Sequence, residues 1–273
     1  MVYERNLNAL RAVNNSGRIV RYLEEHTEWK SKKVSVEDAL NNEQIIVYHD
    51  MKDIYLNSRY NPSAAADVFI DQFTHITEQS GLIMFGLSNG VFAKKFFEKI
   101  DKEVFLFVYE PSIDIFQAVI HEIDISDLLL NRKFLIFVEG INEGSLATAI
   151  ESNSGYQNYC KILYTELPQY VRLFEKSYDI YREIVKKQAV ALQLTINTAL
   201  VRGNRFSYTA IQNMRYLPGC RNGFDYVGKF PADMPAIVVA AGPSLEKNVD
   251  LLKQAKGKAL IIVVDSAIKT VYS

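Results

Sequence analysis

The sequence predicts an α/β protein with a Rossmann-like parallel-sheet domain, a helical connector and the start of a second Rossmann-like α/β domain. Three observations predict this class. Short apolar runs alternate with helical periodicity over the first 165 residues, as in a doubly wound parallel sheet. Between residues 168 and 216 only the helical rhythm remains. From residue 236 the alternation of strand and helix resumes. We therefore expect domains at residues 1–165, 166–218 and 219–273.

The first domain divides into elements at its glycines, prolines and polar clusters. Apolar residues at three- and four-residue intervals predict helices at residues 3–25 (with a break near 14–17), 67–77 and 91–100. Short apolar runs predict strands at residues 44–48, 82–85, 104–109, 134–138 and 161–164. Ser112 is placed to cap a helix that runs through Phe116 and Val119.

The connector shows apolar residues in helical rhythm from Phe174 to Leu200. Gly203 separates this stretch from a second helical segment over residues 205–216, so we expect a break there. Glycine and proline predict loops at residues 217–223 and 230–235.

The most informative stretch begins at residue 236. An apolar run over residues 236–240 is followed by a sharp turn at 241–244 and by helical spacing from Glu246. A second apolar run, residues 259–264, leads into Asp265 and Ser266. Units of this kind bind ligands beyond the carboxyl ends of their parallel strands.

The residues at these strand ends form the predicted nucleotide-binding site: Gly242, Pro243, Ser244, Leu245, Asp265 and Ser266. Gly242 permits close backbone approach, and the helix start offers free N–H groups to a phosphate. Ser244 could instead serve as a helix cap, and Asp265 and Ser266 could be a polar strand end. The loop lacks the lysine of a Walker phosphate-binding sequence, so it does not support Walker chemistry.

A second candidate ligand loop follows the strand at residues 82–85, and its residues are Gly86, Ser88, Asn89, Gly90 and Glu110. Glu110 ends the next strand, 24 residues after Gly86. This separation is close to the roughly 20 residues expected for an acid that binds a ribose. The alternative is that tight packing of strand on helix requires the glycines.

Composition excludes several classes. The net charge of −1 provides no general basic field for nucleic acid. No apolar run is long enough for a membrane helix, and two separate cysteines, Cys160 and Cys220, fit a reducing cytoplasm. The four histidines have no partner four residues away, so we expect no metal site. We expect a cytoplasmic protein that contacts neither nucleic acid nor membrane.

Residues 235–245, Pro-Ala-Ile-Val-Val-Ala-Ala-Gly-Pro-Ser-Leu, and residues 261–267, Ile-Ile-Val-Val-Asp-Ser-Ala, carry a family resemblance. They resemble the opening of the transferase domain of the bacterial motility accessory factor (Maf) family. The same domain family includes archaeal 6-hydroxymethylpterin pyrophosphokinases. Residues 55–62, 86–90, 109–111 and 197–218 are similar to upstream regions of Maf proteins. The resemblance implies an amino-terminal part whose carboxyl-terminal domain is truncated.

The resemblance implies a glycosyltransferase that moves a nonulosonic, sialic-acid-like sugar from a CMP-sugar donor to Ser or Thr of flagellin or another protein acceptor. Mg²⁺ would be an optional aid, no other cofactor is implied, and the catalytic residues stay unknown. Two alternatives remain: a 6-hydroxymethylpterin pyrophosphokinase-like enzyme, and a non-catalytic module that binds a partner protein. An incomplete second domain exposes apolar strands, so we also expect a homodimer.

Overall fold

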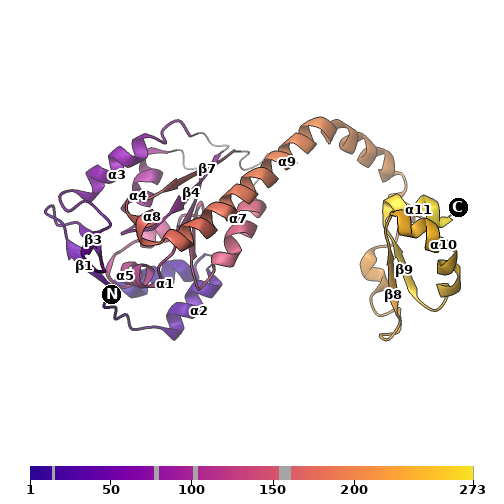
Figure 1. Cartoon of the computed structure of the whole chain (residues 1–273), viewed down its shortest axis with the longest axis horizontal. Helices are drawn as coiled ribbons and strands as arrows, with labels where there is room; N and C mark the ends of the chain where they lie inside the picture. The colour runs from indigo at the N-terminus through magenta and orange to yellow at the C-terminus, as the bar shows by residue number, and fades with distance from the viewer. Residues whose placement is uncertain (14–15, 77–79, 101–103, 154–160, 273) are drawn as a thin grey trace. The chain divides into compact units, whose positions relative to one another are not determined.

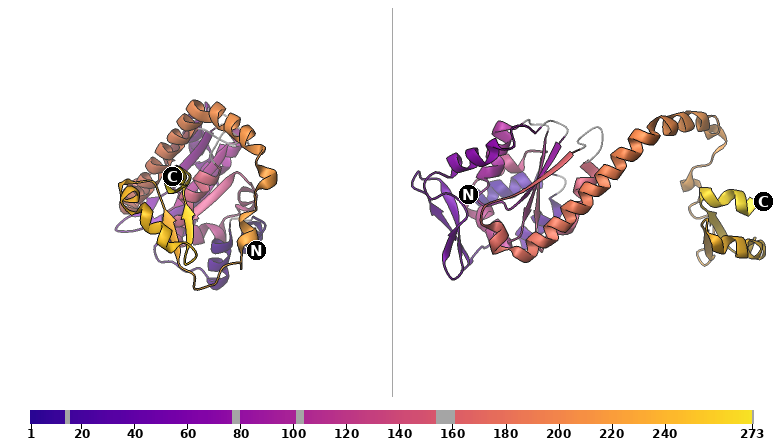
Figure 2. Two further views of the ribbon diagram at one scale, coloured as in Figure 1. Left: turned by 90° about the vertical axis from the view of Figure 1, so that its right-hand side faces the viewer. Right: turned by 45° about the horizontal axis from the view of Figure 1, so that its top comes forward.

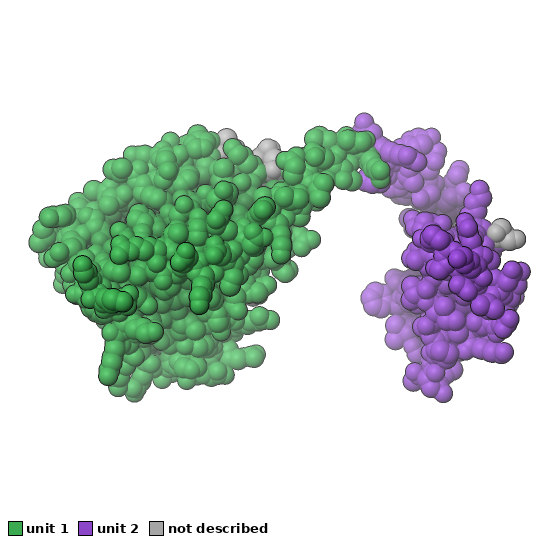
Figure 3. All heavy atoms as spheres, viewed as in Figure 1, with its two compact units in different colours: residues 1–203 green, residues 204–273 purple. Residues whose placement is uncertain are grey.

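The computed structural model describes residues 1–13, 16–76, 80–100, 104–153 and 161–272 (Figure 1). Cys160 lies outside these residues. The chain divides into two compact units, Met1–Gly203 and Asn204–Ser273, which Figure 3 colours separately.

A parallel four-stranded sheet forms the centre of the first unit. Its strands are β4 (Ser80–Phe85), β5 (Phe105–Glu110), β6 (Phe134–Val138) and β7 (Lys161–Glu166), and their spatial order is β6-β5-β4-β7. The first of these strands along the chain, β4, therefore lies inside the sheet. β5 and then β6 are added on one side of β4, and β7 is added on the other side. The point where the order reverses lies between β4 and β7, and ligands bind at such a point in many α/β proteins. The predicted Rossmann-like α/β class is confirmed.

Helices cover both faces of this sheet. Right-handed crossovers place α4 (Val91–Lys99) and α5 (Ile113–Glu122) on one face and α7 (Leu146–Asn153) on the other. The first half of α9 (Glu175–Met214) runs along the sheet beside β7, as the right-hand view of Figure 2 shows. The Tyr181 hydroxyl on α9 fixes this contact, because it lies 3.0 Å from the Ile83 carbonyl oxygen and 3.3 Å from that of Thr165.

The amino-terminal helices lie against α5. The buried side chain of Asn6 on α1 (Val2–Arg11) donates to the carbonyl oxygens of Ile120 and Ile123 and accepts from the N–H of Ile125. These bonds satisfy the end of α5, where free carbonyl groups need partners. The remaining short elements are α2 (Gly17–Glu25), α6 (Ser126–Leu129), η1 (Glu143–Ser145), α8 (Tyr170–Leu173), η2 (Leu217–Gly219) and η3 (Gly223–Tyr226).

A separate antiparallel sheet was not predicted. It consists of β1 (Val34–Asp38), β2 (Gln44–His49) and β3 (Asp53–Tyr55), in that order. The strand expected at residues 44–48 is confirmed as β2, but it pairs with two short strands instead of joining the parallel sheet. Half of the residues in these two strands are polar and nearly all are at least partly exposed, so the strands show no apolar run from which they could be predicted.

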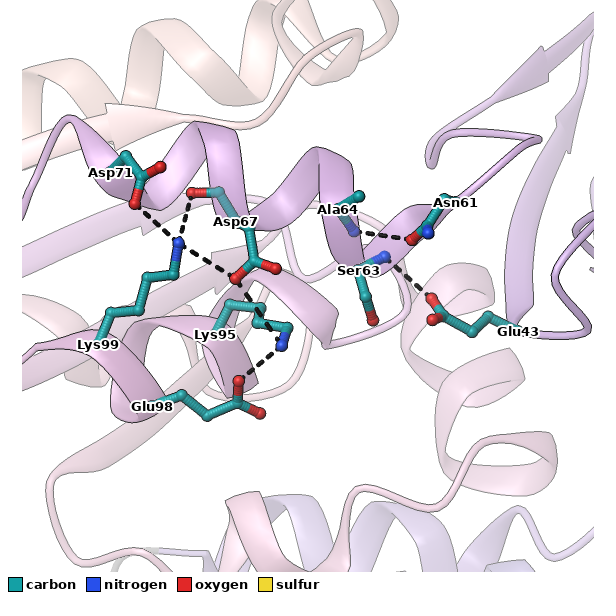
Figure 4. A network of polar contacts seen from close by, with 9 residues as sticks. All are labelled: Glu43, Asn61, Ser63, Ala64, Asp67, Asp71, Lys95, Glu98 and Lys99. Atoms are coloured by element: carbon teal, nitrogen blue, oxygen red, sulfur yellow. Dashed lines mark hydrogen bonds and ion pairs between the residues drawn. The ribbon is translucent and has the colours of Figure 1, made fainter.

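Helix α3 (Pro62–Asp71) starts five residues earlier than the sequence predicts. The Asn61 side chain caps it by accepting from the Ala64 N–H, and Pro62 suits the first helical position. Lysines of α4 hold α3 in place: Lys99 contacts Asp67 and Asp71, and Lys95 contacts Asp67 (Figure 4). Such partly exposed ion pairs each contribute at most about 1 kcal/mol, so they orient the two helices more than they stabilise them.

The long helix α9 continues through Gly203 over forty residues. The predicted break at this glycine is wrong. A glycine within a helix costs only about 1 kcal/mol, and the flanking residues keep the helical pattern.

The second unit contains the predicted strand–loop–helix–strand arrangement. Strands β8 (Ala236–Val239) and β9 (Leu260–Val263) pair in parallel, with α10 (Pro243–Ala255) between them and α11 (Asp265–Tyr272) after β9. A small core of Val239, Leu245 and Ala267 joins the helices to one side of the strands. On the other side Val238 and Ile262 are 69% and 48% exposed. Among the described residues, no helix has the length and apolar content that a membrane crossing needs.

Candidate nucleotide site

The carboxyl ends of β8 and β9 bring two helix starts together. The two strands are in register to their last residues, and the Val264 N–H donates to the Val239 carbonyl oxygen at 3.0 Å. Helix α10 begins just after β8 and α11 just after β9. The predicted residues 242–245 and 265–266 therefore lie at one edge of the same two-stranded sheet.

The turn into α10 is built on extended backbone at Gly242, with φ −169° and ψ 167°. Pro243 occupies the first helical turn, and the Leu245 N–H closes the turn on the Gly242 carbonyl oxygen at 2.9 Å. The Leu245 side chain is buried and anchors the loop to the small core. No atom lies within 4 Å of the place where a Cβ at Gly242 would stand, so the loop is open on that side.

Ser244 does not cap the helix. Gly242 is the N-cap residue, and no side chain caps this end of α10. The capping interpretation of Ser244 is therefore wrong, and its exposed hydroxyl lies in the first helical turn beside the open loop. This hydroxyl and the neighbouring backbone N–H groups together form a set of donors that suits a phosphate.

The edge formed by the carboxyl ends of β8 and β9 combines positively charged helix starts with two carboxylates. Both helix starts carry partial positive charge, because the aligned peptide dipoles of a helix place it at the amino-terminal end. Asp265 adds a carboxylate, whose Oδ1 accepts from the Ser266 N–H at 2.7 Å, and Glu246 adds a second in the first turn of α10. Asp265 and Ser266 are exposed, so their oxygens can contact hydroxyl groups of a ligand. The arrangement can bind one phosphate flanked by sugar hydroxyls.

The second candidate loop, at the end of β4, is also assembled as predicted but is closed. Gly86 and Gly90 both have positive φ, at 105° and 83°. Ser88, Asn89 and Glu110 are buried, and Glu110 accepts from the Leu87 N–H at 2.8 Å. The Glu110 carboxylate is thus buried directly beneath the loop that begins at Gly86.

Tyr170 fills the space that a ligand of this loop would need. Its hydroxyl accepts from the Ser88 N–H at 2.7 Å and donates to Oε2 of Glu110 at 2.9 Å. Its ring lies 2.8 Å from the position of a Cβ at Gly86. Tyr170 follows β7, so it enters the sheet at the point where the strand order reverses. Sequence reasoning missed it, because 60 residues separate Tyr170 from Glu110 and no local pattern connects them.

The buried pair shifts the acidity of both groups. Burial raises the pKa of Glu110 to about 7, although hydrogen bonds from Leu87, Ser112 and Tyr170 act in the opposite direction. Burial and the neighbouring Glu110 carboxylate raise the pKa of the Tyr170 hydroxyl well above its usual 10. Glu110 therefore changes charge near neutral pH while Tyr170 keeps its proton.

The antiparallel sheet closes the other side of this loop. The Asn57 side chain donates to Oδ1 of Asn89 at 2.8 Å, and Asn89 donates to the Gln44 carbonyl oxygen at 2.7 Å. The Ser88 hydroxyl donates to the Leu56 carbonyl oxygen. A ligand would have to displace Tyr170 to reach the loop, so a binding role here stays a prediction.

Comparison with known proteins bears on the second unit. Residues 208–273 match the model of a family described as 6-hydroxymethylpterin diphosphokinase MptE-like. The carboxyl-terminal segment is thus similar to this family. The match includes every residue of the open site at β8 and β9, and it confirms the resemblance of this segment to the domain family named from its sequence.

Two solved structures are similar to the chain at low identity. One is the Maf glycosyltransferase from Magnetospirillum magneticum AMB-1, with 12% identity and a TM-score of 0.47 over 98% of this chain. This chain spans about half of that protein, covering 47% of its length. The other is MnmC2 from Aquifex aeolicus, with 8% identity and a TM-score of 0.28 over 60% of this chain and 65% of that one. No curated protein matches the sequence.

Proposed function

We propose that the chain binds the nucleotide-sugar donor of a Maf-type glycosyltransferase at the carboxyl ends of β8 and β9. The observation that carries the proposal is the MptE-like match over a segment that contains the open Gly-Pro-Ser loop and Asp265. The resemblance of residues 55–62, 86–90 and 109–111 to upstream Maf regions favours a Maf-type protein.

The geometry is suited to a CMP-sugar. When the sugar leaves, negative charge grows on the phosphate of CMP, and donors fixed beforehand stabilise it most effectively. The Ser244 hydroxyl and the backbone N–H groups of Ser244 and Glu246 supply such donors, while Asp265 and Ser266 lie close enough to contact the hydroxyls of the nucleoside. Asp265 is the carboxylate that would hold Mg²⁺ beside the phosphate. We assign no catalytic base.

A pterin diphosphokinase is the second candidate, because the matching family is described by that activity. It would place a phosphate at the same loop, so the two candidates differ in the remainder of the ligand. A cytidine-specific site favours the transferase, and a site for ATP together with a hydroxymethylpterin favours the kinase.

The proposed partners are flagellin, or another protein that presents a Ser or Thr acceptor, and a second copy of the chain. The exposed Val238 and Ile262 support association, since a strand face that apolar is usually covered. Light scattering of the purified chain tests the homodimer directly, and a monomeric mass at micromolar concentration would refute it.

Calorimetric titration with CMP and with a CMP-nonulosonic acid tests the proposed function, with and without Mg²⁺. Gly242→Trp is the decisive variant: the extended backbone tolerates any residue, a Cβ there meets no neighbouring atom within 4 Å, and a large ring at the loop would obstruct a ligand. We expect saturable binding to the wild type and a loss of at least about tenfold in the variant, about 1.4 kcal/mol.

Gly219→Trp is the matched control, because this exposed glycine of the same unit also has open space around it and lies outside the β8–α10–β9 arrangement. It should bind CMP like the wild type. Binding of ATP and hydroxymethylpterin instead of CMP would favour the kinase. An absence of binding at millimolar ligand would contradict both enzymes and favour a module that holds a partner protein.

A further inference from the structure

A cavity of about 480 Å³ lies along β6, the edge strand of the parallel sheet, away from both candidate loops. It is bounded by α1 and α2 on one side and by η1 and α7 on the other. Its apolar lining includes Leu10, Ile19, Leu129 and Phe134, all of which belong to the main core. The volume falls within the range of roughly 300–1,000 Å³ that small-molecule sites have.

The edge strand contributes backbone groups to this cavity. The Leu106 N–H donates to the Lys133 carbonyl oxygen, so residues 134, 136 and 138 direct their N–H and C=O groups away from β5. The Asn142 side chain bonds the Ile136 carbonyl oxygen and the Val138 N–H, and the Phe134 N–H bonds Asn131. The Ile136 N–H and the Phe134 carbonyl oxygen have no partner at this edge among the described residues.

Two guanidinium groups stand at the rim. Arg18 on α2 and Arg132 before β6 are exposed and line the cavity, and no hydrogen bond, ion pair or ring contact joins either to another described residue. Ser145 and Thr148 add hydroxyl groups from the opposite wall. Positive charge without a protein partner over an apolar floor favours a ligand that carries both an anionic group and an apolar body.

We propose that this cavity binds a small organic anion whose apolar part occupies the core-facing floor and whose carboxylate, sulfonate or phosphate group pairs with Arg18 and Arg132. A wholly apolar ligand would leave both guanidinium groups unpaired. A free inorganic phosphate would be too small to pair with the guanidinium groups and also contact the apolar lining. The site is independent of the nucleotide site proposed for the second unit.

The probe for this site is 8-anilinonaphthalene-1-sulfonate, which joins an aromatic body to one anionic group and fluoresces when it leaves water. We expect saturable binding to the full chain, weakened roughly tenfold by Arg18→Ala and by Arg132→Ala, the size expected for one charge-assisted contact. Hydrogen exchange should slow at residues 134–138 and 145–152 when the probe binds, which separates this cavity from exposed apolar surface elsewhere.

Arg21→Ala is the matched control, since Arg21 is an exposed arginine of the same helix that does not line the cavity. It should bind the probe like the wild type, and Arg18→Lys should recover part of the loss. Equal binding by all four variants, or protection confined to residues outside the cavity, would overturn the proposal. Circular dichroism of each variant verifies that the fold is retained.

Discussion

The loops at Gly86 and Gly242 both connect a strand to a helix, but the first is filled by a protein side chain and the second is open. Each follows a strand of a parallel pair and leads into a helix, but β4 is buried along its whole length whereas only Val239 of β8 is buried. In the first unit, Gly86 has φ 105° and faces the Tyr170 ring, which fills the space above the loop. In the second unit, Gly242 is extended and faces open space. Two glycine loops in the same position can therefore differ, one filled by the protein's own side chain and the other open, and the local sequence does not distinguish the two.

Removal of Tyr170 is the strongest test of the difference between the filled loop at Gly86 and the open loop at Gly242. Tyr170→Ala deletes a fully buried ring, removes one of the hydrogen bonds to Glu110 and leaves the Ser88 N–H without its partner. We expect a loss of about 3–5 kcal/mol in the free energy of unfolding of the first unit. Urea unfolding followed by the fluorescence of Trp29, the single tryptophan of the chain, measures it.

Tyr164→Ala is the matched control for this variant, because Tyr164 lies on β7 but is 59% exposed. It should cost far less than Tyr170→Ala. Equal losses in the two variants would mean that Tyr170 does not brace the loop.

The parallel core was predictable because its strands are continuous apolar runs. The structure reproduces the strand at residues 134–138 to the residue, and β4 and β5 within one or two positions at each end. The periodicity also predicted α4 and the capping role of Ser112. These features depend on neighbours in sequence, so local patterns determine them.

What sequence reasoning missed depends on distant contacts. The strands β1 and β3 form only by pairing with β2, and their residues are too polar to show a run. Tyr170 and Glu110 meet only once the strand order places β7 beside β4. For the second unit, the position of residues 242–245 and 265–266 at one edge of the sheet followed from the strand–loop–helix–strand pattern, while their binding role stays a prediction. The N-cap position, at Gly242 instead of Ser244, did not follow from it.

The two units should also differ in how their stability depends on pH, because only the first has a buried carboxylate beside its glycine loop among the described residues. The pKa of Glu110 is raised from 4.5 to about 7 in the folded protein, so the folded state binds this proton more tightly than the unfolded chain. Its contribution is complete below about pH 4.5, falls as the pH rises to 7 and is lost above it, a change of about 3 kcal/mol. The second unit contains no comparable buried carboxylate among its described residues.

Glu110→Gln isolates this contribution, because the variant has nothing to titrate at that position. The unfolding free energy of the wild type minus that of the variant should fall by about 3 kcal/mol between pH 4.5 and 7.5. A flat difference across this range would show that folding does not raise the pKa of Glu110.

An alanine at each glycine gives a smaller, paired effect. In Gly86→Ala the new Cβ meets the Tyr170 ring at a positive φ, and we expect a loss of about 1–3 kcal/mol. In Gly242→Ala the extended backbone and open space accept the methyl group, and the change should stay within about 0.5 kcal/mol. Thermal unfolding of the two variants compares them. Similar losses at both positions would remove the distinction between a packed loop and an open one.

Replacement of Ser244 should have the smallest effect on stability. A comparison with Ser112 distinguishes a serine that caps a helix from one whose hydroxyl is free to bind a ligand. Ser112 caps α5 by accepting from the Ile115 N–H, so Ser112→Ala should cost about 1 kcal/mol. Ser244 is not the cap of α10, so Ser244→Ala should change stability by less than about 0.5 kcal/mol.

If the Ser244 hydroxyl contacts the phosphate, the same variant should bind CMP roughly fivefold more weakly, about the value of one hydrogen bond. Calorimetry and thermal unfolding of both variants measure the two quantities. A stability loss at Ser244 as large as that at Ser112, with unchanged CMP affinity, would make this serine part of the scaffold and weaken the case for a phosphate at the loop.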